Sequence, residues 1–112
     1  MAFIQELPYV AESISSVTTF AIDLSSIRAK NNNSIAAEIE VTGANVVVKF
    51  GYDSGVTANY TVTSNTFPAG NYHCTAGTVK TLSVPSQATH FSICPKSGGT
   101  ANVAINFGFE RK

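Results

Sequence analysis

This sequence has few charged residues. Only 12% of its 112 residues are Asp, Glu, Lys or Arg, about half of the roughly 25% typical of soluble domains. The seven basic and seven acidic side chains cancel, and the longest basic run is Arg111 and Lys112 at the end of the chain. Because binding to a phosphate backbone depends on clustered Lys and Arg, the sequence does not indicate a nucleic-acid partner.

Long apolar runs and cysteines are also scarce. No apolar run approaches the roughly 20 residues of a membrane span, and Glu6 interrupts an N-terminus that has no basic start, so we expect neither a membrane segment nor a secretory signal. Two cysteines, Cys74 and Cys94, are few for a disulfide-stapled secreted domain. We expect two free thiols, with a Cys74–Cys94 disulfide as the open alternative. A chain of this length forms one domain that buries enough surface for a core.

Residues 34–53 show the strongest periodicity. Ile35, Ile39 and Val41 alternate with polar residues, and after a break at Gly43 the alternation resumes and ends at Phe50. This pattern predicts two strands joined as a β-hairpin, with one apolar face that a second sheet must cover.

The rest of the chain supplies further short strands and turn signals, with no convincing helix. Residues 1–12 are apolar around Pro8 but lack a clean period, so we expect an extended arm that is tied to its own domain or to a neighbour. The remaining 13–112 would form a single domain. Beside the hairpin, strands are predicted at residues 13–24, 56–63, 72–75, 78–84, 89–94 and 101–109. About eight short strands indicate an all-β, antiparallel two-sheet sandwich of jelly-roll type.

Histidine and cysteine are the residues that most invite a chemical interpretation. His73 and Cys74 are adjacent on a predicted strand and therefore point to opposite faces, whereas His90 and Cys94 share a face but lie roughly 13 Å apart. Zinc ligands must each come within about 2.3 Å of the metal, so we expect no metal site and no other cofactor. No nucleophile motif with a base and an acid is present, and we expect no enzyme activity.

Three other groups favour ordinary structural roles. Glu38 and Glu40 share a strand face and are expected to face solvent, where they oppose edge pairing. Residues 96–100 lack the spacing and following helix of a phosphate loop and predict a hairpin loop. Tyr52, Tyr60 and Tyr72 lie in different segments, so packing is a simpler interpretation than a carbohydrate platform.

The distribution of charge favours an assembled protein. Between Ser54 and Phe109 the only charged side chains are Lys80 and Lys96, and a weakly charged β-surface with exposed edges invites association. The two ends of the chain are the elements most suited to reach a partner. The residues expected to contact a partner protein or a second copy are Phe3, Ile4, Leu7, Tyr9, Phe109, Arg111 and Lys112.

Two stretches carry a resemblance to a known family. They are TTFAIDLSSIRAKNNNSIAAEIEVTGANVVVKFGYDSGVTANYTVTSNTFPAG and SVPSQATHFSICPKSGGTANVAINFGFERK, with an FGYDSG corner and a final GTANVAINF strand. This pattern resembles the capsid decoration, or staple, proteins of short-tailed bacteriophages of the epsilon-fifteen type. The resemblance covers residues 18–112. It implies a jelly-roll-like sandwich on the capsid exterior.

The resemblance also implies partners. Such a protein would be made in the host cytoplasm, bind the major capsid protein and often form a homodimer that staples neighbouring capsid subunits, without membrane or nucleic-acid contacts. The alternative is a carbohydrate-binding sandwich module of a phage tail or a secreted enzyme. A cluster of exposed aromatic residues on one sheet face would favour that alternative.

Overall fold

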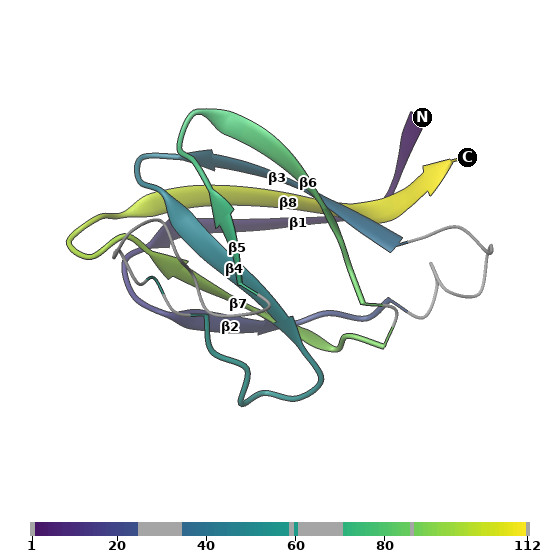
Figure 1. The fold of residues 1–112 in the computed structure, drawn as a ribbon, viewed down its shortest axis with the longest axis horizontal. Coiled ribbons are helices and arrows are strands. Elements are labelled where there is room, and N and C mark those ends of the chain that lie inside the picture. The colour runs from purple at the N-terminus through teal and green to yellow at the C-terminus, as the bar shows by residue number, and fades with distance from the viewer. Residues whose placement is uncertain (1, 25–34, 59, 61–70, 86, 112) are drawn as a thin grey trace.

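The fold is a sandwich of two antiparallel sheets. A computed structural model describes residues 2–24, 35–58, 60, 71–85 and 87–111, and for residues 2–12, 71 and 109–111 it describes the backbone alone. In spatial order, the first sheet contains β1 (Ala2–Ile14), β8 (Ala101–Arg111), β3 (Ile35–Thr42) and β6 (Thr78–Ser83). The second sheet contains β2 (Thr18–Ala21), β7 (His90–Pro95), β4 (Val46–Gly51) and β5 (Asn71–Cys74). Figure 1 shows the two layers.

The strands pair in a nested order. β1 pairs with β8, β2 with β7, β3 with β6 and β4 with β5, all antiparallel. Two further pairings, β3 with β8 and β4 with β7, join these pairs into the two sheets. A long antiparallel ribbon that is folded over on itself in this way is a jelly roll. The predicted all-β sandwich of jelly-roll type is therefore confirmed.

The core lies between the two sheets and is built from the period-two positions. Ile39 of β3 and Ile105 of β8 are fully buried, as is Phe91 of β7. The Phe91 ring stacks on Phe20 at 5.1 Å and tilts against Phe107 at 5.7 Å. These centroid separations are the favourable ones for aromatic pairs. The aromatic cluster thus fastens β2 and β7 of one sheet to β8 of the other.

The predicted hairpin of residues 34–53 is wrong in its pairing. Both strands form at the predicted positions, but β3 belongs to the first sheet and β4 to the second, and they do not pair with each other. The apolar faces were assigned correctly, and each strand buries its apolar face against the opposite sheet. The turn between them has Gly43 at φ +89°, and a Cβ there would lie 2.6 Å from the carbonyl oxygen of Thr100. This turn therefore carries the chain from one layer to the other.

Two other predicted boundaries differ from the structure. The strand expected over residues 13–24 is divided, because Ser13 has φ +56° and the chain turns before β2 begins. The segment expected as an arm, residues 1–12, contributes most of β1, whose backbone pairs along β8. The strand expected over residues 56–63 is not formed at 56–58 or 60, and its other residues lie outside the described part of the chain.

Four connections gather at one end of the sandwich, which we call the loop end: residues 15–17, 43–45, 75–77 and 96–100. The backbone carbonyl of Asn45 accepts a hydrogen bond from the Lys96 N–H at 2.9 Å, and its side-chain oxygen accepts one from the Ala76 N–H at 2.8 Å. Asn45 therefore ties three of the connections together. Residues 96–100, predicted as a hairpin loop, also cross between the sheets, from β7 to β8. The two chain termini lie at the opposite end (Figure 1).

Candidate functional site

The described residues among those expected to contact partners lie on β1 and β8, which pair with each other. Phe3, Ile4, Leu7 and Tyr9 lie on β1, Phe109 and Arg111 lie on β8, and Lys112 is outside the described residues. The register places Ile4 opposite Phe109 and Ala2 opposite Arg111. At this end of the molecule the structure describes the backbone and not the side chains. The backbone places the beginning of β1 beside the end of β8 (Figure 1).

A second feature lies on the outer face of the second sheet. Residues 56–58 and 60, which we call the strap, run across this face after β4. The Thr19 hydroxyl donates to the Val56 carbonyl at 3.0 Å, and the Ala58 N–H donates to Ser92 Oγ at 2.9 Å. The Tyr60 hydroxyl forms a hydrogen bond with His73 Nε2 at 3.1 Å. The strap is thus held to β2, β7 and β5.

The burial of residues on this face is unusual for the outer side of a sheet. Val47 points away from the core, between inward-facing Val46 and Val48, yet it is 0% exposed. Ser92 is likewise 0% exposed, and it is the buried polar residue of the described chain. Gly51, also on this face, is packed so closely that an added Cβ would lie 2.5 Å from Val56 Cβ. The outer face of the second sheet is therefore a small second core beneath the strap.

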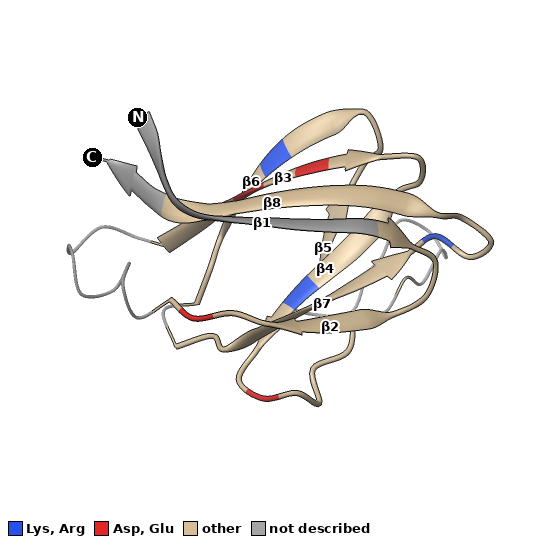
Figure 2. Ribbon diagram, turned by 180° about the vertical axis from the view of Figure 1, so that it is seen from behind, with Lys and Arg blue, Asp and Glu red and all other residues tan. Residues whose placement is uncertain are grey.

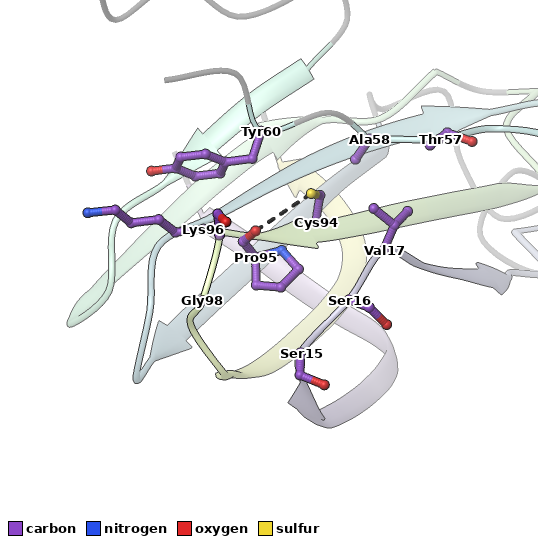
Figure 3. A pocket seen from close by; sticks show the side chains of 11 residues that line it. Ser15, Ser16, Val17, Thr57, Ala58, Tyr60, Cys94, Pro95, Lys96 and Gly98 are labelled. Carbon is purple, nitrogen blue, oxygen red and sulfur yellow. Dashed lines mark hydrogen bonds between the residues drawn. The ribbon is translucent and has the colours of Figure 1, made fainter. Parts of the chain in front are cut away.

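An open hollow of about 570 Å³ lies where the strap meets the loop end. Ser15, Ser16 and Val17 line one side, Ala58 and Tyr60 line another, and Cys94 to Gly98 close it. Figure 3 shows the Cys94 side chain inside the hollow, with a hydrogen bond from Sγ to the Pro95 carbonyl at 3.6 Å. The described lining has no His or carboxylate beside the thiol, so it offers no base to activate that nucleophile.

The two cysteines are free and lie on opposite faces of the second sheet. Cys74 is opposite Val46 on β4 and buried in the core, whereas Cys94 is opposite Val47 and half-buried on the outer face. The expected free thiols are confirmed, and the disulfide alternative is excluded by this geometry. Burial raises the pKa of the Cys74 thiol to about 11, although the nearby Lys80 ammonium opposes the shift. Cys74 is therefore a core thiol and Cys94 an accessible one.

The histidines do not assemble a metal site. His73 and Cys74 point to opposite faces, as the strand periodicity predicted, and no group of metal-ligating side chains is present among the described residues. Partial burial, and then the Lys80 ammonium, lower the pKa of His73 below its ordinary value. Lys80 Nζ also donates to the His73 carbonyl at 2.9 Å. His73 thus serves as an anchor for the strap through Tyr60.

Glu38 and Glu40 lie on the outer face of the first sheet, as expected. Glu38 is half-buried and Glu40 exposed, opposite Thr81 and Val79 of β6. The role expected for them against edge pairing is wrong, because β3 is flanked by β6 and β8 and is not an edge. Their position makes this part of the face the most acidic of the described surface, as Figure 2 shows.

The three tyrosines are dispersed. Tyr72 points inward and its ring lies 6.4 Å from Phe50, Tyr60 is half-buried in the strap, and Tyr52 is 65% exposed in the turn after β4. The packing interpretation therefore holds for Tyr72 and Tyr60. Among the described residues the three do not form a shared aromatic platform.

Charges are few and scattered over the described surface (Figure 2). Lys49, Lys80 and Lys96 are its described cations, and they lie on β4, on β6 and at the loop end. Within the described part of the chain there is no helix long and apolar enough to cross a membrane. The surface thus offers hydroxyl, amide and small apolar groups over most of its described extent.

The strap and the hollow were not predicted from the sequence. One signal for them was present: Val46, Val47 and Val48 form a continuous apolar run, which is typical of a strand buried on both faces. Alternation alone had assigned Val47 to the polar face. Nothing in the sequence indicated that residues 56–58 and 60 would lie against this face.

No model of a known protein family matches the chain, and none of the curated proteins is significantly similar to it.

Proposed function

We propose that this chain is a structural virion protein that decorates the outside of a phage capsid and staples neighbouring major capsid proteins. The observation that carries the proposal is the nearly uncharged surface of the jelly roll: between Ser54 and Phe109 only Lys80 and Lys96 are charged. The centres of protein interfaces are depleted in charged residues because desolvating an ion is costly. A surface of Ser, Thr, Asn and small apolar residues is suited to burial against another protein.

The position of the chain ends supports the proposal. The β1 and β8 ends lie side by side, with Ile4 opposite Phe109, so a single contact would engage both ends of the chain. The last two residues of the sequence, Arg111 and Lys112, are cations that would meet acidic groups of the shell. The loop end, at the far side of the molecule, would remain available to a second capsid subunit or to solvent.

Stapling needs little affinity from each copy. A stable interface buries about 1,600 Å² in total, and a domain of this size has room for modest contacts with more than one subunit. Many symmetric copies add their contributions, and each contact raises the effective concentration for the next. The summed binding energy of the copies would make the shell more resistant to internal pressure.

The test is co-sedimentation of the purified chain with capsid shells that lack it. The R111E/K112E variant reverses the charge of the terminal end, and K96E is its matched control at the loop end. We expect wild type and K96E to sediment with shells, and R111E/K112E to remain in solution with an unchanged thermal midpoint. A folded wild-type chain that does not sediment with capsid shells but is retained on a polysaccharide column would overturn the proposal in favour of a carbohydrate-binding module.

A further inference from the structure

Four of the described strands lie at the edges of the two sheets, and they differ in how they are protected. An edge strand presents unpaired N–H and C=O groups, and natural proteins blunt it with short length, proline, charge or bulges. β2 and β5 of the second sheet have four residues each. β1 of the first sheet is longer but contains Pro8 and two register shifts, which twist and interrupt an edge. These three edges are therefore poor templates for another strand.

β6 has almost none of these protections. Its six residues, TVKTLS, contain no proline, and they pair with residues 36–41 of β3 without a register shift. Every residue except Leu82 is exposed, and Val79 is 54% exposed. Lys80 is its one charged residue, and its ammonium is hydrogen-bonded to the His73 carbonyl at 2.9 Å. A regular, exposed and weakly charged edge is a ready template for strand addition.

The register shows which amides of β6 face outward. The Val84 N–H donates to the Ile35 carbonyl at 3.0 Å, in the same register that pairs Leu82 with Ala37. In an antiparallel pair, residues alternate between facing the partner strand and facing away from it. Leu82 and Lys80 therefore direct their backbone groups to β3. Val79, Thr81 and Ser83 direct theirs to the free edge.

We propose that a second copy of the chain pairs with this edge, antiparallel, about a two-fold axis at Thr81. Thr81 then lies opposite Thr81 of the second copy, and Val79 lies opposite Ser83 of that copy. Each outward N–H meets a carbonyl, and the first sheets of the two copies become one continuous sheet. An axis at Lys80 would also pair the outward amides, Val79 with Thr81 of the second copy, but it would place the two Lys80 side chains opposite each other, and like charges directly opposite are unfavourable.

This pairing adds a contact between copies to the proposed function. The biological use of the pairing rests on that proposed function. A contact of one strand on each side is smaller than the standard interface of about 1,600 Å², so the dimer forms in solution only at high protein concentration. On a capsid surface, neighbouring copies are held close and the effective concentration is high. Pairing through β6 would leave the terminal end of each copy free for the shell.

The experiment exploits the fact that residue 81 faces itself across the axis. T81R and T81E each place like charges opposite one another, whereas a mixture of the two places opposite charges together. By sedimentation velocity we expect wild type to dimerise with rising concentration, each variant alone to stay monomeric, and the mixture to dimerise. T81V, which keeps the amide and adds no charge, is the matched control and should dimerise like wild type.

Hydrogen exchange gives an independent readout in the wild type. The amides of Val79, Thr81 and Ser83 should exchange more slowly as the protein concentration rises, whereas Leu82, already bonded to β3, should not change. Wild type that stays monomeric, or T81R that dimerises as well as wild type, would overturn the pairing. Either result would leave the shell-binding proposal intact. A chain that dimerises through β6 but does not sediment with capsid shells would overturn the proposed function and leave the pairing intact.

Discussion

Replacing Gly51 by alanine is the sharpest test of the strap. Gly51 is buried at the end of β4, and its carbonyl accepts a hydrogen bond from the Thr89 N–H at 2.9 Å. An added Cβ would lie 2.5 Å from Val56 Cβ and 2.7 Å from its Cγ2. Carbon atoms in contact prefer about 3.5–4.0 Å, so either the strap or β4 must move by roughly 1 Å.

The structure allows the size of the effect to be worked out. Overpacking of this kind costs about 1–3 kcal/mol, and replacing a strand glycine by alanine returns roughly 0.5–1 kcal/mol through backbone entropy. The expected net loss in the free energy of unfolding is about 1–2 kcal/mol. For a domain of this length, that corresponds to a fall of about 4–8 °C in Tm.

The assay is urea unfolding followed by circular dichroism, together with amide exchange at Ala58, which reports whether the strap has lifted. A double-mutant cycle isolates the contact. V56A retains the clashing Cβ and should not rescue G51A, whereas V56G removes it and should restore most of the lost stability. A G51A protein as stable as wild type, or equal rescue by V56A and V56G, would refute this account of the strap.

Three further predictions concern buried polar and titratable groups. S92A removes the acceptor of the buried Ala58 N–H, so urea unfolding should show a loss of about 1–3 kcal/mol. In the native protein a disulfide reagent should modify Cys94, which lies in the hollow, and reach Cys74 only after denaturation. The pKa of His73 is lowered in the folded chain, mainly by burial, so the unfolded chain binds the proton more readily. Stability should therefore fall as pH decreases from about 7.5 through the unfolded pKa of about 6.5.

Matched variants separate these effects from general damage. S83A lies on the exposed face of β6 and should change stability by less than about 0.5 kcal/mol. C94S should abolish the reaction of the native protein with the reagent, and a reaction that persists would mean that Cys74 is accessible. H73Q should flatten the pH dependence that develops as pH falls below about 7.5. An unchanged slope in H73Q would show that another group titrates.

The strands of the middle of the chain were predictable because one face of each is buried in a single core. Ile35, Ile39 and Val41 fix β3 by alternation, and Phe91 and Ile93 do the same for β7. Pairing was not predictable from that signal. Period two reports which face is buried, but a hairpin and a crossover between sheets bury the same residues. The pattern of residues 34–53 therefore predicts a hairpin as readily as the crossover that the structure has.

The expected number of strands was reached for partly wrong reasons. β1 was missed as a strand because Pro8 and two register shifts disturb its alternation, and an edge strand tolerates both. The segment that begins at Val56 was expected as a strand because it is rich in β-branched residues and alternates. Its described residues instead contact the outer face of the second sheet and do not pair as a strand. Residues 25–34, which carry the turn signals of the asparagine run, lie outside the described part of the chain.

The nested pairing has a consequence for how the chain folds. β1 pairs with β8 and β2 pairs with β7. During synthesis, β1 and β2 therefore cannot form these pairs until β7 and β8 have been made. Loop closure over most of the chain must precede these contacts, and topologies of this kind fold slowly, in milliseconds to seconds. A chain released before residue 101 would leave β1 unpaired and β3 bare on one side. Translation to completion is therefore a condition of folding, and interrupted synthesis would feed aggregation or proteolysis.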